Sequence, residues 1–482
     1  MPSVIETAIR RTITKGVVAL HNFNRQRMAA PKKANPFLGG LHAPLDREFT
    51  LDRLAVRGHI PSELNGRYLR IGPNPIGKVN PANHHWFMGD GMVHGVRLQD
   101  GKALWYRNRW VRSTAVSRAL GEAPAPGPRH FSDTVNTNVL GHAGKTWALV
   151  EAGGYPVELS AELDTVAHNP FEGSLKGSFS AHAHTDPETG AMHAICYEAQ
   201  DPDTIRHVVV GSDGKVQREE PIAVRHGPSI HDCMITKNYI IVLDLPVTFS
   251  MLKFAAGYGF PYRWNPAHQA RVGVLRKTAP GTDIVWCDVQ PCYVFHPCNA
   301  FETADGKITL DVVAHATMFE DSMVGPTARG SQFERWTIDT VARQVARRVV
   351  DAQPQEFPRP DERRMGQPYR YAYTVGLARG DAGQFETDQL LIKHDLETGG
   401  RQLHDFGAGH AVSEFVFQPR HASAAENEGW LMGYVVDSRT QTTDFVILDA
   451  QHFADEPVAV VTIPHRIPMG FHGNWVSAAV AA

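Results

Sequence analysis

The sequence predicts an all-β protein, and three observations lead to this fold class. From Leu51 onward, short apolar runs alternate with turn signals, as expected for strands joined by tight turns. Three Asp-Gly turns, at Asp100-Gly101, Asp213-Gly214 and Asp305-Gly306, are each followed by lysine and each join two β-rich runs. Strands continue as far as residues 458–463, and no long helices alternate with them.

Composition predicts one folded domain over residues 41–482. The 482 residues have length enough for two or three domains, but no Gly/Ser-rich or Pro-rich linker divides them. A hydrophobic content of 42% and a charged content of 21% are typical of a globular protein. The five cysteines are odd in number and lack metal-site spacing, which favours a reducing cytoplasm over a disulfide framework. The net charge of -3 argues against a nucleic-acid partner.

Residues 1–40 form a basic N-terminal arm with seven Lys or Arg and one Glu. Apolar residues recur there at roughly helical spacing, with Arg10, Arg11 and Lys15 between them, so we expect an amphipathic helix. Such a helix is suited to peripheral contact with a membrane surface; the alternative is that it packs on the body of its own protein. The arm lacks the long apolar run of a signal peptide or membrane span.

Four of the 25 histidines lie in or beside short apolar or aromatic runs that indicate buried strand ends: His182, His231, His296 and His472. No two of them have the spacing of a zinc finger or an H-E-x-x-H helix, so spacing alone defines no site. Neutral imidazole is a good ligand for a divalent transition metal. Four separate strands bring such ligands together only if they radiate around a common axis, and we predict a metal site of this kind.

Other interpretations of these histidines stay open. Any single histidine in a chain with so many is more often an ordinary side chain than a ligand. His182 and His184 form an H-x-H pair of the kind found in metallohydrolases, and His231-Asp232 suggests a proton-relay pair. A zinc hydrolase is therefore an alternative, although it leaves the sequence blocks described next without an explanation.

Several sequence blocks occur in order along the chain: GRYLR (66–70), GPNP (72–75), HWFMGDGMVH (85–94), NTN (136–138), EFP (356–358) and FHG (471–473). Together they resemble the carotenoid cleavage oxygenases, a family that includes apocarotenoid, retinoid and stilbene-cleaving members. The resemblance extends from about residue 39 to residue 475. Each block alone is a weak signal, whereas the whole ordered set is specific.

The resemblance implies a seven-bladed β-propeller with helical and loop insertions that form a dome over the active-site face. A propeller meets the geometric demand of the four histidines, because its inner strands surround one axis. The residue types do not choose between zinc, copper and iron, but the resemblance implies one ferrous ion per chain with O2 as cosubstrate. It also places Thr137 near an open coordination position.

Three glutamates stand at positions that the resemblance assigns to carboxylates accepting from the outward imidazole N–H groups: Glu151, Glu356 and Glu414. Glu151 and Glu414 interrupt apolar segments, where a lone carboxylate is costly unless it is paired. The alternative, a surface charge on a loop, fits Glu356 best and Glu151 least.

The resemblance implies oxidative cleavage of a carbon–carbon double bond into two carbonyl products. Stilbene-cleaving relatives typically carry a lysine where this chain has Val150 and a tyrosine where it has Trp110. A pocket with Val150, Trp110 and Phe295 favours an apolar carotenoid or apocarotenoid, cut at or near its central 15,15′ bond. The alternatives are a stilbene or phenylpropene cleaving oxygenase of the same family and a non-catalytic propeller that binds a ligand.

One aromatic stretch, residues 245–264, departs from the strand-and-turn pattern. Exposed, it would form an apolar patch suited to a membrane or partner; buried, it is core. Because members of the family take lipophilic substrates from membranes through such a patch, we predict an entry patch of Phe249, Leu252, Phe254, Tyr258 and Phe260. The expected partner is thus a lipophilic small molecule, and the sequence predicts no oligomeric state.

Overall fold

The computed structural model describes residues 4–29, 34–326, 330–378 and 386–478. Over these residues the chain forms 33 strands, three α-helices and five short 3-10 helices. Almost every strand pairs antiparallel with its neighbours, as the many tight turns of the sequence require. The predicted all-β fold class is confirmed.

Five consecutive stretches of chain each fold into a four-stranded antiparallel unit whose strands run in order from one edge to the other. The first two units are β6 (Asn138–His142), β7 (Lys145–Leu149), β8 (Val157–Leu159) and β9 (Thr165–His168), then β10 (His184–Thr185), β11 (Met192–Glu198), β12 (Asp201–Val210) and β13 (Val216–Ala223). The third unit is β14 (Cys233–Ile235), β15 (Tyr239–Asp244), β18 (Arg271–Arg276) and β19 (Val285–Asp288). The next two are β20 (Tyr293–Glu302), β21 (Ile308–His315), β22 (Gln332–Asp339) and β23 (Gln344–Asp351), then β24 (Gln355–Pro360), β25 (Tyr371–Leu377), β26 (Thr387–Asp395) and β27 (Gly400–Asp405).

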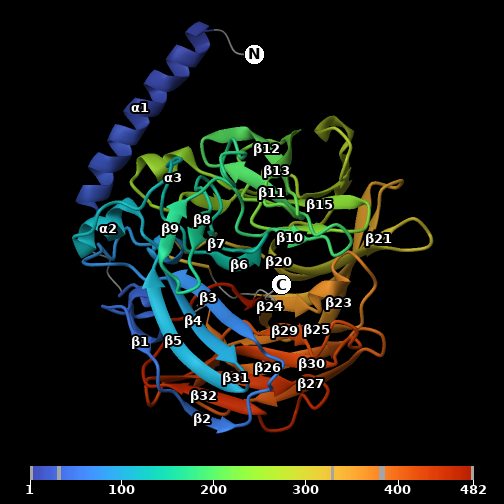
Figure 1. Ribbon diagram of the computed structural model, residues 1–482. Helices are drawn as coiled ribbons and strands as arrows, with labels where there is room; N and C mark the ends of the chain where they lie inside the picture. The colour runs from blue at the N-terminus through green and yellow to red at the C-terminus, as the bar shows by residue number, and fades with distance from the viewer. Residues whose placement is uncertain (1–3, 30–33, 327–329, 379–385, 479–482) are drawn as a thin grey trace.

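Two further units contain strands from both ends of the chain. One consists of β28 (His410–Val412) and β29 (Val416–Pro419) beside β30 (Gly429–Asp437), followed by β31 (Thr442–Asp449), β32 (Ala459–Ile463) and β2 (Ala55–Gly58). The other is β33 (Gly473–Ser477), β3 (Gly66–Pro73), β4 (Gly91–Gln99), β5 (Lys102–Trp110) and β1 (Thr50–Leu51). Figure 1 shows the blue N-terminal strands beside the red C-terminal ones. The two ends of the chain therefore close the ring of sheets.

The third and fourth units count as one eight-stranded sheet, but the strand pairing between them is a single parallel pair, Asp288 with Gln344. Divided there, the sheets form seven antiparallel units, in agreement with the predicted seven-bladed propeller. Helix α2 (Thr114–Leu120), helix α3 (Met251–Ala255) and the hairpin of β16 (Val247–Phe249) and β17 (Tyr262–Trp264) are insertions between blade strands.

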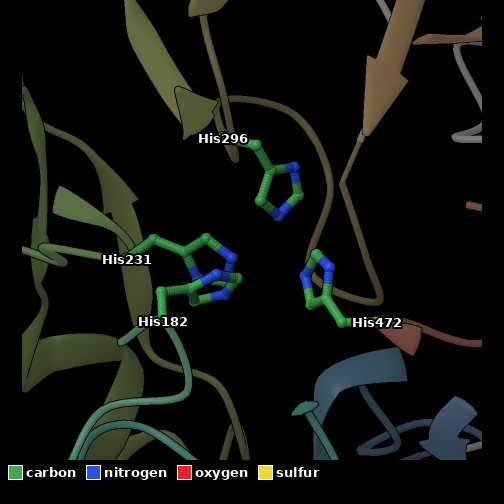
Figure 2. Close-up of side chains that lie close together, drawn as sticks. All are labelled: His182, His231, His296 and His472. Atoms are coloured by element: carbon green, nitrogen blue, oxygen red, sulfur yellow. The ribbon is translucent and has the colours of Figure 1, made fainter. Parts of the chain in front are cut away.

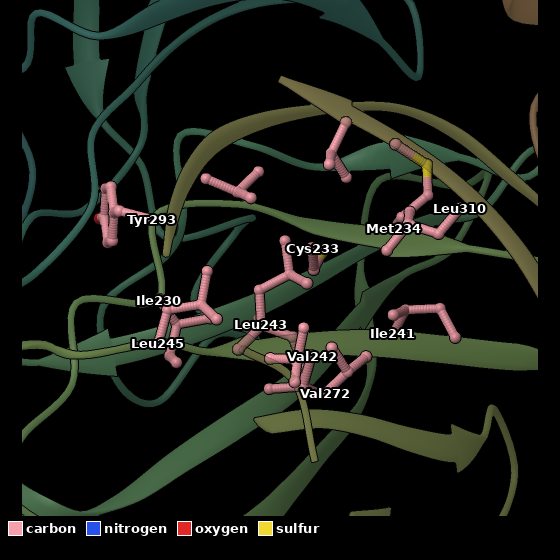
Figure 3. Close-up of a cluster of buried hydrophobic side chains, with 14 of the residues drawn as sticks. Ile230, Cys233, Met234, Ile241, Val242, Leu243, Leu245, Val272, Tyr293 and Leu310 are labelled. Carbon is pink, nitrogen blue, oxygen red and sulfur yellow. The ribbon is translucent and has the colours of Figure 1, made fainter. Parts of the chain in front are cut away.

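The core lies between the faces of neighbouring sheets, so strands in the interior of a sheet are buried on both sides. In β3 every residue is buried, whereas in the outer strand β23 none is. Figure 3 shows part of the largest apolar cluster, in which Ile241 and Val242 from β15, Val272 from β18 and Leu310 from β21 lie close together. This burial holds the inner strand ends, and any side chains they carry, in fixed positions.

Helix α1 (Val4–Arg27) extends away from the propeller, with its C-terminal end against α3 (Figure 1). The ring of His21 stacks on Phe254 at a centroid distance of 4.3 Å, and Asn24 Nδ2 donates to the carbonyl of Ala255 at 2.8 Å. A helix is thus present in the predicted arm, and its C-terminal end packs on the body of the protein. None of the helices that the structure describes is long and apolar enough to cross a bilayer.

Candidate metal centre

The four predicted histidines come together where the inner strands of four blades meet (Figure 2). His182 and His231 each lie two residues before an edge strand, β10 and β14, His472 directly precedes β33, and His296 is in β20. One ring nitrogen from each histidine lies within 4.8 Å of the others. The ring centroids of His182 and His231 are 4.4 Å apart, and those of His296 and His472 are 4.7 Å apart.

Close backbone packing fixes the position of His472. A Cβ atom on Gly72 would lie 2.5 Å from Cα of Gly470, so only glycine allows the two segments to approach this closely. The backbone N–H of Ile71 then donates to the carbonyl of His472 at 3.0 Å, and the N–H of Phe471 donates to the carbonyl of Ile71 at 3.0 Å. Two of the sequence blocks therefore pack against each other and position a histidine that is close to the end of the chain.

Each predicted glutamate accepts a hydrogen bond from one of the histidines. His231 Nδ1 lies 2.8 Å from Glu151, His296 Nδ1 lies 2.6 Å from Glu356, and His472 Nδ1 lies 3.0 Å from Glu414. Burial alone would raise the pKa of Glu356, but the nearby His296 lowers it by more. The net effect is a lowered pKa, so this carboxylate stays ionised. The glutamates fix which ring nitrogen carries the proton and orient the other nitrogen toward the centre.

Asp232 faces the fourth histidine and was missed in the sequence analysis, where it was considered only as a partner of His231. Its Oδ2 atom lies 3.4 Å from His182 Nδ1, and its Oδ1 atom lies 2.8 Å from His184 Nε2. Consecutive residues of an extended chain point to opposite sides, so Asp232 points away from the ring of His231 and toward the neighbouring blade. One feature of the sequence could have identified Asp232: it is a carboxylate that directly follows a predicted ligand within a buried run.

The inward nitrogens match the donor set that a divalent transition metal requires. Nε2 of His182 and of His296 is buried without a hydrogen-bond partner among the residues that the structure describes. Burial lowers the pKa of His182 to about 4 and that of His472 well below its usual value, so both rings are neutral near pH 7. Neutral imidazoles with unused inward lone pairs, each facing a carboxylate on the other side, can hold such an ion.

An apolar cavity of about 1170 Å³, including its open mouth, leads to three of these histidines. Among the residues that the structure describes, Glu151 is its only carboxylate, and no Lys or Arg lines it. Aromatic side chains make up much of the wall: Trp86, Phe87, Phe131, Phe249, Phe254, Phe260, Phe295, Phe357 and Phe471. Thr137 also lines the cavity, and its hydroxyl donates to Asn136 Oδ1 at 2.9 Å.

The cavity contains most, but not all, of the residues predicted to contact substrate. Val150 and Phe295 line it, whereas Trp110 does not. Strand β5 pairs with β4 so that Trp110 is opposite Met92, and its indole Nε1 donates to the carbonyl of Asn74 at 2.8 Å. The indole is thereby held in a separate buried cluster with Met92 and Val116.

The predicted entry patch divides between the cavity and the surface. Phe249, Phe254 and Phe260 line the cavity, and Tyr258 is half-buried outside it. Leu252 in α3 is 85% exposed, and its neighbour Met251 is 57% exposed. Within the predicted patch, the exposed apolar surface is therefore a small area on α3 beside the cavity; Phe131 and Met88, which also line the cavity, are exposed as well.

Comparison with known proteins agrees with this geometry. The family model described as "Retinal pigment epithelial membrane protein" matches residues 42–477. A carotenoid cleavage oxygenase of Mycobacterium tuberculosis is 40% identical over 495 residues, which cover 92% of this chain and 98% of that one. This chain belongs to the carotenoid cleavage oxygenase family. A carotenoid 9,10(9′,10′)-cleavage dioxygenase of Crocus sativus is 31% identical and covers 92% of this chain and 89% of its own.

Solved structures of the family share the fold. Cobalt-substituted apocarotenoid oxygenase of Synechocystis superposes with a TM-score of 0.81 at 26% identity, covering 90% of this chain and 97% of its own. Lignostilbene dioxygenase of Pseudomonas brassicacearum gives a TM-score of 0.82 at 25% identity, covering 93% and 100%. This member of the carotenoid cleavage oxygenase family is thus a β-propeller enzyme, and the zinc hydrolase and non-catalytic alternatives gain no support.

Proposed function

We propose that this carotenoid cleavage oxygenase holds one ferrous ion on His182, His231, His296 and His472 and uses O2 to cleave a double bond of a carotenoid or apocarotenoid. The observation that carries the proposal is the meeting of four inward imidazole nitrogens at the end of an apolar aromatic cavity. In a family of oxygenases, this juxtaposition brings a metal and a lipophilic substrate to the same place.

When bound, ferrous iron supplies the activation of O2, which side chains alone do not provide. The protein supplies the four neutral donors and, in Glu151, Glu356, Glu414 and Asp232, negative charge that offsets the charge of the ion. The cobalt-substituted relative supports a divalent ion in this family.

The cavity residues orient the substrate and exclude water. The ring of Phe87 meets those of Phe260, Phe295 and Phe471 edge to face, at centroid distances of 5.3, 6.0 and 5.5 Å. A flat conjugated chain can pack against such rings, and a dry, shaped cavity keeps one bond near the histidines. Thr137, whose hydroxyl is occupied by Asn136, presents its methyl group as the part free to restrict access beside the ion.

We place the scissile bond at or near the central 15,15′ position of an apolar polyene. Val150 and the lack of Lys and Arg among the described residues of the cavity wall support a substrate without ionised groups. The competing position is the 9,10 bond, which the name of the Crocus sativus relative gives as its cleavage site. The lengths of the two carbonyl products distinguish cleavage at the 9,10 bond from cleavage at the 15,15′ bond.

A stilbene or phenylpropene substrate is the second candidate. Two relatives favour it: the lignostilbene dioxygenase and a resveratrol cleavage oxygenase of Aspergillus fumigatus that is 28% identical and covers 92% of this chain and 95% of its own. Incubating the iron-loaded enzyme with an apocarotenal and with resveratrol separates the two candidates. Cleavage of resveratrol alone would overturn the preference for a polyene.

We further propose that α3 contacts a membrane surface from which the substrate enters, because exposed Leu252 and Met251 lie beside the cavity. Replacing both with serine should reduce flotation of the full chain with liposomes, and deletion of residues 1–30 should show whether the N-terminal arm adds to binding. If both variants float with liposomes as the unmodified chain does, the proposed membrane contact is wrong. The five cysteines, all buried and free, support a reducing cytoplasm.

A further inference from the structure

A second cavity reaches the histidine cluster from another side of the propeller. It has a volume of about 880 Å³, including its open end, and it shares His296 and His472 with the apolar cavity. His182 lines only the second cavity, and His231 lines only the first. The ring of four imidazoles thus separates two spaces.

The two cavities differ in their charge. Three carboxylates line the second cavity, Asp232, Glu362 and Glu414, against the single guanidinium of Arg359. Within the described part of the chain, the apolar cavity has one carboxylate and no cationic side chain of Lys or Arg. Arg359 donates to Glu362 and, at 3.4 Å, lies beside Glu414, so the carboxylates of the second cavity retain a net negative charge.

The second cavity also connects the surface with the histidines. At its outer end Gly141 and Thr185 are exposed, and the side chain of Glu362 is 60% exposed. At its inner end Asp232 and His182 are buried. Polar oxygen and nitrogen atoms therefore line this cavity at both its outer and its inner end.

A divalent ion in water carries a tightly held hydration shell, and moving it through an apolar space without replacement ligands is very unfavourable. A negatively charged polar passage attracts the ion and offers oxygen and imidazole atoms in place of water as it moves inward. Asp232, which is 2.8 Å from His184 and 3.4 Å from His182, lies at the last step before the histidine ring.

We propose that this second cavity, called here the polar passage, is the route by which the hydrated metal ion enters and leaves the centre, while the lipophilic substrate uses the apolar cavity. The proposal rests on the proposed function in one respect, that the four histidines hold a metal. Because it concerns a path, it predicts changes in rates of metal exchange without a change in equilibrium affinity.

The test measures uptake of Fe²⁺ under anaerobic conditions, and of Co²⁺ by its absorption, into full-length protein from which metal has been removed with a chelator. Release from loaded protein to excess chelator is measured in parallel. Thr185→Trp narrows the outer end of the polar passage, and because Thr185 is exposed in the edge strand β10, an aromatic residue is accommodated there. Uptake and release should both slow by the same factor, with equal final occupancy.

Glu362→Gln tests the charge of the passage: the side chain is 60% exposed, and the amide oxygen can still accept from Arg359. Uptake should slow about threefold to tenfold at low salt, with a weaker dependence on ionic strength than in the unmodified protein. Glu397→Gln, which removes a carboxylate that is 71% exposed outside both cavities, is the matched control and should leave the rate unchanged. Met88→Trp narrows the mouth of the apolar cavity and should also leave metal uptake unchanged.

Slowing by Met88→Trp but not by the two passage variants would overturn the proposal, because the ion would then use the apolar cavity. Equal rates in all variants would also overturn it and would indicate entry by opening between blades. If the unmodified protein binds neither ion, the proposed function fails and the route fails with it. If the passage variants bind metal with normal affinity and at unaltered rates, only the proposed route is refuted and the proposed function stands.

Discussion

On the side of β20, His296 donates to Glu356 at 2.6 Å, whereas on the side of β10 the carboxylate nearest His182 Nδ1 is that of Asp232, at 3.4 Å. Glu356 is fully buried and also accepts from His315 Nε2 at 2.8 Å and from the backbone N–H of Phe357 at 2.6 Å. Asp232 is also buried and also shared, since it accepts from His184 Nε2 at 2.8 Å and from the backbone N–H of Cys233 at 2.6 Å. The two sides therefore differ in the contact between carboxylate and ligand, which is 2.6 Å on the β20 side and 3.4 Å on the β10 side, where the carboxylate borders the polar passage.

This difference indicates that the four imidazoles do not contribute equally to a metal site. A ligand whose outward nitrogen is tightly paired is oriented before the ion arrives, so little freedom is lost on binding. A ligand with a looser partner next to a polar passage can adjust while the ion enters. The β20 side is then the fixed part of the site and the β10 side the adjustable part.

The largest expected effect is the loss of His296 itself. His296→Ala removes the best-oriented ligand and should lower iron affinity by more than about 100-fold, the upper end of the effect of removing an outer partner. Metal analysis of the purified protein should then find little of the one iron per chain expected without the substitution. The matched control is His268→Gln, which alters a buried histidine paired with Asp244 at 2.8 Å outside the cluster. Full iron content in His296→Ala would exclude this residue as a ligand.

The two sides should also respond oppositely to pH in metal-free protein. Burial lowers the pKa of His182 to about 4, so between pH 6.5 and 4 the unfolded chain takes up a proton that the folded chain does not. This contribution destabilises the fold by up to about 3 kcal/mol as the pH falls through that window. For His296, burial lowers the pKa but Glu356 raises it by more, so the net shift is upward. Protonated His296 therefore stabilises the fold below pH 6.5, and this stabilisation is lost as the pH rises through the pKa of the folded protein.

NMR titration of the imidazole ring protons measures this order directly, with signals assigned by His182→Gln and His296→Gln. As the pH is lowered, His296 should take up its proton before His182 does. The reverse order would show that pairing with Glu356 does not distinguish the two sides.

Glu356→Gln should weaken metal binding about 10-fold to 100-fold, because the amide keeps the shape of the side chain but removes its charge. It also places an N–H group where His315 and Phe357 donate, which leaves a buried donor without an acceptor and lowers the melting temperature. Competition with a chelator of known affinity measures the first effect, and thermal unfolding the second. Glu334→Gln, a buried carboxylate paired with Arg347 away from the cluster, controls for a general loss of stability.

How much of this could be predicted from sequence depends on whether the determining contacts are local. Strands and tight turns follow from short apolar runs and Asp-Gly pairs, so the all-β class was predicted from residues alone. The number of blades was not countable, because strand lengths range from two residues in β10 to ten in β12 and β20. The propeller came from the resemblance, and the predicted meeting of the four histidines is seen in the structure.

The errors at the site have the same origin. Asp232 follows His231 in the chain but faces His182 and His184 of the neighbouring blade, a contact that no sequence spacing encodes. Trp110 aligned with a substrate residue of relatives, but the register of β5 against β4 turns its indole toward Asn74. Both cases depend on pairing between strands, which the local sequence does not determine.

The smallest expected effect belongs to the β10 side and decides whether it is the adjustable one. Asp232→Asn should weaken equilibrium metal binding by about tenfold or less, since its contact with His182 is long compared with that of Glu356 to His296. His184→Gln, which removes the second partner of Asp232, is the matched control and should change affinity less than Asp232→Asn does. Chelator competition on both variants, beside Glu356→Gln, measures the ranking. An effect of Asp232→Asn equal to that of Glu356→Gln would mean that all four imidazoles are held alike, and the distinction between the two sides would be wrong.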